Sequence, residues 1–173
     1  MKQKKARQCF NLFTVIFIIF LFLSLIVGLF IGGCFSSAMS YKDAEHYVSE
    51  YSAELFTVVD YLNSFQGEDL FCSKNKGHDM IYHTNTQKWY EIEEKEVRRA
   101  IQCLFDKSRC TRITKTNQTI SFTLFSKSTD AGGGIAFTSS DGLDIEFLTF
   151  SKALSAPFWY YYISDFNKWR LQH

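Results

Sequence analysis

Residues 40–67 read SYKDAEHYVSEYSAELFTVVDYLNSFQG, and they hold the most regular pattern in the chain. Apolar and aromatic side chains recur there at alternating steps of four and three residues, which places them on one face of an α-helix. They are Ala44, Val48, Tyr51, Leu55, Val58, Leu62 and Phe65. Ser40, followed three residues later by Asp43, is typical of an amino-terminal helix cap, and Gln66-Gly67 ends the pattern. The sequence therefore predicts one long amphipathic helix over Tyr41 to Phe65.

The apolar face of this predicted helix needs a surface to pack on. Three heptads are the lower limit for a coiled coil, so a homodimer through residues 44–65 is one alternative. The charges beside the stripe lack a regular opposite-sign pattern, and Phe56 and Val59 widen it. We therefore expect the helix to pack on a sheet of its own chain.

Upstream lies Leu12 to Ile31, an uncharged apolar run of twenty residues. About 20 apolar residues in a helix span the hydrocarbon core of a bilayer. Four basic residues precede the run, and the positive-inside rule keeps that side in the cytosol. We expect a cytosolic basic stub over residues 1–11, a transmembrane anchor or signal segment over residues 12–33, a short tether over residues 34–40, and an extracytoplasmic domain over residues 41–173.

The junction Ile31-Gly32-Gly33-Cys34 permits two interpretations. It resembles the bacterial lipobox, in which the signal is cleaved before a cysteine that is then lipidated, so Cys34 is the candidate lipidation site. Against this, the apolar run exceeds the usual h-region of about 7 to 15 residues, and Phe35 is unusual directly after the cysteine. We favour an uncleaved signal anchor, with lipidation of Cys34 as the alternative.

Downstream of the long helix the sequence predicts strands and one more helix. Met80 to His83 and Trp89 to Ile92 read as a short hairpin or one irregular strand, and the spacing of apolar residues predicts a helix over Glu93 to Asp106. Further strands are expected at Cys110–Lys115, Thr119–Ser126, Gly134–Ser139, Leu143–Phe150 and Phe158–Phe166, with a loop at Gly132-Gly133-Gly134. The expected class is α+β, with the helices on one face of an antiparallel meander.

Across residues 41–166 the order of these elements resembles that of cystatin-like and nuclear-transport-factor-2-like domains, including membrane-anchored subunits of bacterial secretion machines. The resemblance is one of layout without a shared motif, so it implies a fold class and no particular activity.

The cysteines are informative because of the predicted compartment. Cys72, Cys103 and Cys110 lie in the part expected outside the membrane, where disulfides persist. We favour a Cys103–Cys110 disulfide, whose short loop is worth roughly 2.5 kcal/mol in the chain-entropy model. Neither a Cys-x-x-Cys nor a His-x-x-x-His spacing accompanies them, so we expect no metal and no other cofactor.

The last predicted strand carries aromatic rings on both faces. If Trp159, Tyr161 and Ile163 face the core, period-two alternation puts Tyr160 and Tyr162 on the open face. The neighbouring predicted strand adds two carboxylates to that face. The candidate binding residues are therefore Tyr160, Tyr162, Asp144 and Glu146, a set that suits a protein or glycan contact.

Charge and motifs limit the function classes. Four of the nineteen basic residues lie in the stub, which leaves fifteen against eighteen acidic residues outside, a balance of −3 that argues against nucleic-acid binding. His46 and Glu50 lie one helical turn apart, but on an expected solvated face, and no local catalytic motif is present.

We therefore expect a non-enzymatic protein-binding or assembly module of a bacterial envelope. It is expected to be single-pass, with its amino terminus in the cytoplasm. An exported lipoprotein that captures a ligand or neutralises a toxin is the alternative, and a hydrolase is the third. The glycosylation sequon Asn117-Gln118-Thr119 is also compatible with a eukaryotic type II membrane protein, which stays an open alternative.

Overall fold

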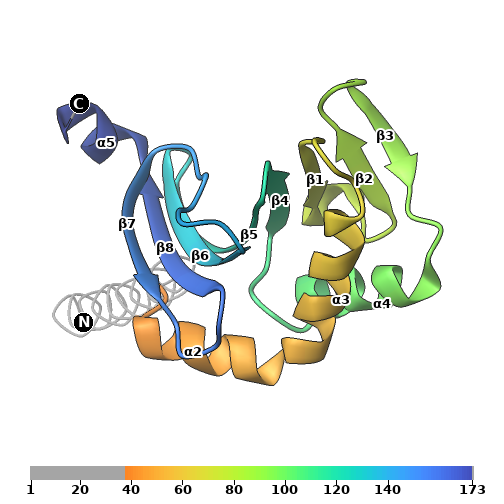
Figure 1. Cartoon of the computed structure of the whole chain (residues 1–173), viewed down its shortest axis with the longest axis horizontal. Helices are drawn as coiled ribbons and strands as arrows, with labels where there is room; N and C mark the ends of the chain where they lie inside the picture. Colours follow the sequence, from red (N-terminus) through yellow and green to blue (C-terminus); the bar gives the residue numbers. More distant parts are fainter. Residues whose placement is uncertain (1–37, 173) are drawn as a thin grey trace, which may run out of the picture. The chain divides into compact units, whose positions relative to one another are not determined.

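The computed structural model describes residues 38–172. The predicted basic stub, the apolar run Leu12–Ile31 and the candidate lipidation residue Cys34 lie outside these residues. No helix within the described range is long and apolar enough to cross a bilayer. This range forms an α+β unit with four helices and one eight-stranded antiparallel sheet (Figure 1).

The prediction of one long helix is wrong in one respect. The segment forms two helices, α2 (Tyr41–Glu50) and α3 (Ser52–Asn63). The break falls at Tyr51, whose φ of −106° and ψ of 23° leave the helical region. Its ring stacks on Tyr47 with centroids 4.8 Å apart, and its hydroxyl donates to the Lys107 carbonyl. The bend turns the helix axis without shifting the residue register, so the sequence pattern runs through it unbroken.

The start of α2 is as predicted. The Ser40 hydroxyl accepts from the Asp43 N–H, and the Asp43 carboxylate accepts from the Ser40 N–H at 3.0 Å. This is the reciprocal capping box that the Ser40 and Asp43 spacing indicated.

The sheet contains β1 (Leu70–Ser73), β2 (Met80–His83), β3 (Lys88–Glu91), β4 (Arg112–Thr116), β5 (Thr119–Ser128), β6 (Ala131–Thr138), β7 (Leu148–Ala153) and β8 (Trp159–Asp165). The strand order is β3-β2-β1-β4-β5-β6-β8-β7. Consecutive strands form two meanders, β1–β2–β3 and β4–β5–β6, but the predicted continuous meander is interrupted, because β1 pairs with β4 and β8 lies between β6 and β7. The helix α4 (Lys95–Asp106) joins β3 to β4, and α5 (Phe166–Gln172) follows β8.

The expected loop at Gly132-Gly133-Gly134 is wrong, because these glycines lie inside β6. A Cβ on Gly134 would collide with the backbone oxygen of Phe122 on β5. A Cβ on Gly133 would lie 2.7 Å from the ring of Phe125. The glycines therefore mark close approach of neighbouring backbones inside a strand.

One further strand boundary and two whole elements differ from the prediction. Residues 143–147 precede β7 as a loop, so the expected strand Leu143–Phe150 begins only at Leu148. The strand β1 and the helix α5 were not predicted. The hairpin of β2 and β3 and the helix α4 agree with their predicted positions.

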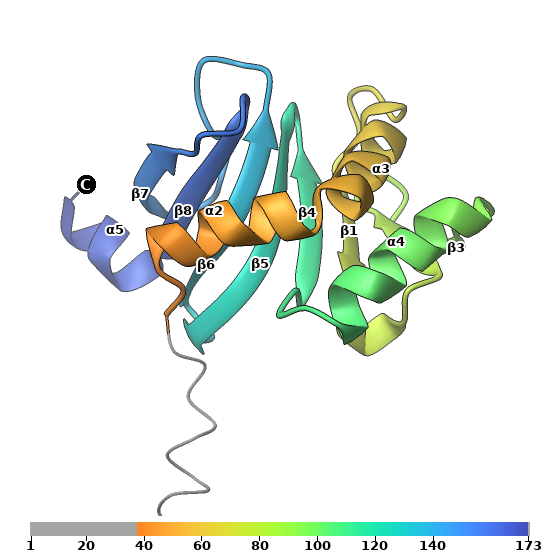
Figure 2. The ribbon, with the colours of Figure 1, turned by 90° about the horizontal axis from the view of Figure 1, so that it is seen from below.

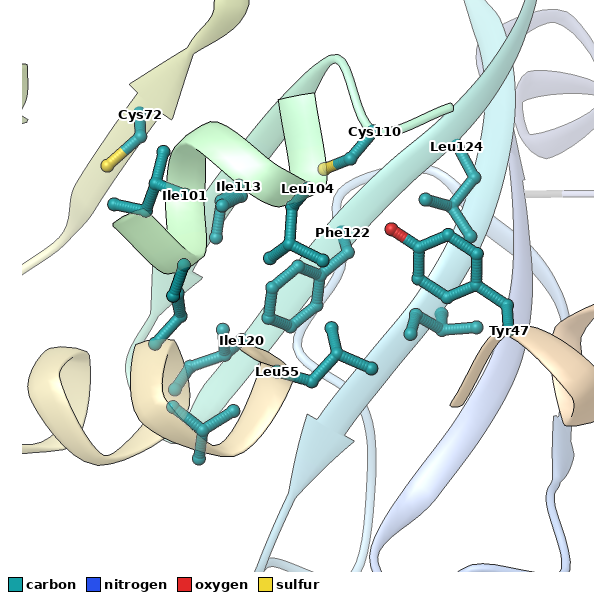
Figure 3. Packing of buried hydrophobic residues seen from close by; sticks show 14 of the residues in the cluster. Tyr47, Leu55, Cys72, Ile101, Leu104, Cys110, Ile113, Ile120, Phe122 and Leu124 are labelled. Atoms are coloured by element: carbon teal, nitrogen blue, oxygen red, sulfur yellow. The ribbon is translucent and has the colours of Figure 1, made fainter. Parts of the chain in front are cut away.

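The helices α2, α3 and α4 lie on one face of the sheet, as Figure 2 shows with α2 crossing the strands. The buried cluster forms between them and the sheet (Figure 3). It includes Leu55 from α3, Leu104 from α4 and Phe122 from β5, each 2% exposed or less. The apolar stripe on α2 and α3 therefore packs within its own domain, as expected.

Contacts between distant parts of the chain fix α2 at its amino-terminal end. The Tyr161 hydroxyl donates to the Met39 carbonyl at 2.7 Å, and the Tyr41 hydroxyl donates to the Ala153 carbonyl at 2.8 Å. The β7–β8 turn is held in the same way, because the Glu45 carboxylate accepts from both the N–H and the hydroxyl of Ser155. The first described helix is thus tied to the last two strands.

Candidate functional site

The face of the sheet opposite α2, α3 and α4 carries an open hollow of about 680 Å³. Its walls come from strands β4, β5, β6 and β8 and from the loops around residues 128–131 and 146–147. Most of the lining groups are hydroxyl-bearing or charged, among them Arg112, Thr123, Ser126, Glu146, Tyr162 and Ser164. A second hollow of about 420 Å³ adjoins it, and Glu146 lines both.

Tyr162 forms part of the wall of the larger hollow. It pairs with Gly134 on β6, and its hydroxyl lies 3.4 Å from the Thr123 hydroxyl on β5, beyond that strand. The ring therefore lies over the glycine backbone of β6, where no side chain opposes it. Burial raises the pKa of Tyr162, so the phenol is neutral at physiological pH and acts as a hydrogen-bonding group.

The loop that carries Glu146 is fixed at both ends. The Asp144 N–H donates to the Thr119 hydroxyl at 2.9 Å, and the Asn117 amide donates to the Asp144 carboxylate at 2.5 Å. Phe147 has a φ of 55°, unusual for a bulky residue, and its ring packs 4.9 Å from that of Phe166 on α5. These contacts hold the exposed Glu146 carboxylate at the rim of the hollow.

The predicted faces of β8 agree with the structure, but the predicted exposure does not. Trp159 and Tyr161 join the core beneath the helices, and Ile163 packs against it. Tyr162 is on the opposite face as expected, yet it is only 3% exposed, so its assignment as an exposed residue is wrong. The cause is the glycine opposite it, which lets the ring lie flat against the sheet. Tyr160 is half-buried and lines neither hollow.

The predicted carboxylates are exposed, but they lie on the loop rather than on a strand beside β8. Glu146 shares the larger hollow with Tyr162, whereas Asp144 lines only the smaller one. Sequence reasoning missed Arg112, Thr123 and Ser164. No sequence signal marks them, because they come from three separate strands and only the strand order and register bring them together.

The three cysteines in the described range are free thiols, so the expected Cys103–Cys110 disulfide is not formed in the structure. Cys110 is fully buried and its thiol donates to the Arg112 carbonyl, whereas Cys103 lies half-buried beside Glu54 on α3. Burial raises the pKa of Cys72 to about 12 and that of Cys110 higher still. These two thiols are therefore protonated and unsuited to nucleophilic attack.

The predicted solvated pair is observed as such. His46 and Glu50 are 3.5 Å apart, with side chains 80% and 51% exposed, so the contact contributes little to stability. Among residues 38–172, no group of three or more His, Cys, Asp or Glu side chains is placed to hold a metal ion.

Comparison of the chain with protein-family models, with curated proteins and with solved structures found no match.

Proposed function

We propose that this protein is a membrane-anchored extracytoplasmic module of a bacterial envelope that binds another protein through the open face of its sheet. The observation that carries the proposal is the asymmetry of the sheet. Three helices cover one face, while the other presents a hollow lined by polar groups. The apolar run Leu12–Ile31 supplies the expected anchor.

The chemistry of the hollow supports binding rather than catalysis. Its exposed hydroxyls donate and accept hydrogen bonds and the Glu146 carboxylate accepts them, as wet protein interfaces require. No thiol lines it, and the buried thiols of the domain are protonated. A non-enzymatic role therefore fits the groups that meet there.

Capture of a small ligand is the second candidate. A hollow of about 680 Å³ lies within the size range of ligand pockets. The polar lining then favours a ligand rich in hydroxyl or amide groups.

The experiment that separates these functions is site-specific photocrosslinking of the full chain in its native membrane. A photoreactive amino acid replaces Glu146 at the rim of the hollow. A matched control replaces Asp60, an exposed residue of α3 on the helix side of the domain. We expect a discrete adduct with one envelope protein at position 146 and none at position 60.

A second variant tests whether the hollow itself is used. Ser126→Tyr places a ring in the hollow, whereas Ser52→Tyr places the same ring on the exposed start of α3. We expect only Ser126→Tyr to abolish the adduct. Adducts of equal yield at positions 146 and 60 would contradict the proposal. If mass spectrometry detects a small molecule that stays bound to the extracted chain, and Ser126→Tyr abolishes its binding, the result would favour ligand capture instead.

A further inference from the structure

An aromatic cluster lies on the open face, at the end of the sheet formed by β1, β2 and β3. Phe71, Tyr82 and Trp89 occupy one row across these strands, because Phe71 pairs with Tyr82 and Tyr82 pairs with Trp89. Their ring centroids are 4.8 to 5.3 Å apart. All three are only half-buried.

The alternation along the strands assigns the cluster to the open face. Leu70 and Cys72 flank Phe71 on β1, and both are buried in the core under the helices. Side chains that alternate with them point to the other side of the sheet. The cluster therefore shares its face with the hollow described above.

Two cations flank the cluster. The guanidinium of Arg112 lies 5.7 Å from the ring centroid of Phe71, and the ammonium of Lys76 lies 5.8 Å from that of Trp89. Neither forms an ion pair with a carboxylate of residues 38–172. The nearby Lys74 is different, because its ammonium donates to the Phe105 carbonyl at the end of α4. Arg112 also lines the larger hollow, so the cluster and the hollow form one continuous surface.

Aromatic cross-strand pairs stabilise a sheet without any partner. Stabilisation of the sheet does not explain why Arg112 and Lys76 lie beside the rings. Trp, Tyr and Arg are the residues that most often dominate binding energy at protein interfaces, where rings fill pockets and Arg meets carboxylates. Positive charges that form no ion pair within residues 38–172 favour a partner that supplies carboxylates.

The geometry points to an acidic segment of the partner protein as the occupant of the Phe71–Tyr82–Trp89 cluster. Its apolar or aromatic side chains cover the three rings, and its carboxylates face Arg112 and Lys76. This assignment rests on the proposed protein-binding function and names the chemistry of the partner. A single-stranded nucleic acid also stacks on rings beside cations. A continuous phosphate backbone needs a positively charged groove, whereas two cations flank these rings, so we assign a peptide.

The test uses the full chain in detergent micelles and three labelled probes of equal length. One is a peptide of repeated Glu-Leu, one is a peptide of repeated Lys-Leu, and one is a single-stranded oligonucleotide. We expect fluorescence anisotropy to show binding of the Glu-Leu peptide alone, with an affinity that falls as salt is raised. The double variant Lys76→Gln/Arg112→Gln should weaken it about tenfold.

The matched control is Lys42→Gln/Lys95→Gln, which removes two exposed charges from the starts of α2 and α4 and should leave the affinity unchanged. Trp89→Leu keeps an apolar side chain but removes the ring, and it should also weaken binding, with circular dichroism confirming the fold. Equal or tighter binding of the Lys-Leu peptide or of the oligonucleotide would overturn the assignment. So would equal losses in both double variants.

The outcome is separable from the proposed function. A partner crosslinked at position 146, together with no binding of the Glu-Leu peptide, leaves the protein-binding proposal intact and rejects the acidic segment. Binding of the Glu-Leu peptide that Trp89→Leu weakens, with no protein adduct at position 146, supports the acidic site and rejects the rim at Glu146 as the contact.

Discussion

The buried thiols show how single residues set the response of this domain to pH. Burial raises the pKa of Cys72 from 9.0 to about 12. Above pH 9 the unfolded chain loses the thiol proton while the folded chain keeps it. The unfolded state then binds fewer protons, so the free energy of unfolding falls as pH rises.

We expect Cys72→Ala to reduce this alkaline loss by about 1.4 kcal/mol per pH unit over the range from about pH 9 to about pH 12. Urea unfolding of the full chain in reducing buffer, at several pH values for both proteins, measures the two slopes. The substitution itself also lowers stability at neutral pH by opening a small cavity, which shifts the curve without changing its slope. Parallel slopes would show that the Cys72 thiol does not titrate as a buried free group.

At the same scale, the sequence predicted the faces of β8 but not the burial of Tyr162. Period-two alternation follows from the strand backbone alone, so the sequence predicts that Trp159 and Tyr161 share one face of β8. The exposure of Tyr162 depends instead on what opposes it across the sheet. That residue is Gly134, and the pairing of β6 with β8 is a property of the tertiary register.

At the scale of elements, β6 depends on its glycines. A Cβ at position 134 would meet the backbone of Phe122, whereas a Cβ at Gly142 in the following loop meets nothing within 4 Å. We expect Gly134→Ala to lower the free energy of unfolding by about 1 to 3 kcal/mol, as overpacking does. Gly142→Ala should change it little. Thermal unfolding followed by circular dichroism compares the two, and equal stability would mean that β5 and β6 lie further apart than described.

Element boundaries were predictable where local pattern decides them. The hairpin of β2 and β3, the capping box at Ser40 and the helix α4 all follow from turns, caps and periodicity within a few residues. The break at Tyr51 has no signal in the local sequence. The Tyr51 ring packs on Tyr47, and its hydroxyl donates to the carbonyl of Lys107, a residue that is distant in the sequence. The insertion of β8 between β6 and β7 likewise has no local signature.

At the scale of the whole molecule, the proposed anchor over residues 12–33 determines on which side of the membrane the proposed binding face would lie. We expect intact-mass analysis of the membrane-extracted protein to retain residues 1–33, with Cys34→Ala causing no mass change beyond the substitution itself. Cys9→Ala is the matched control in the predicted cytosolic stub. Loss of residues 1–33 with a lipid-sized gain, abolished by Cys34→Ala and not by Cys9→Ala, would establish the lipoprotein alternative.

The ties between α2 and the last two strands also impose an order of folding. Met39 and Tyr41 are held by residues more than a hundred positions later, Tyr161 and Ala153. Contacts of such sequence separation form late and slow the folding of a domain. If the amino-terminal segment enters the membrane first, α2 is the first of the described elements to emerge and among the last to reach its final packing. Until β6 and β8 have formed, the apolar face of α2 lacks part of the surface that buries it, and the nascent chain is then most exposed to misassembly or to chaperone binding.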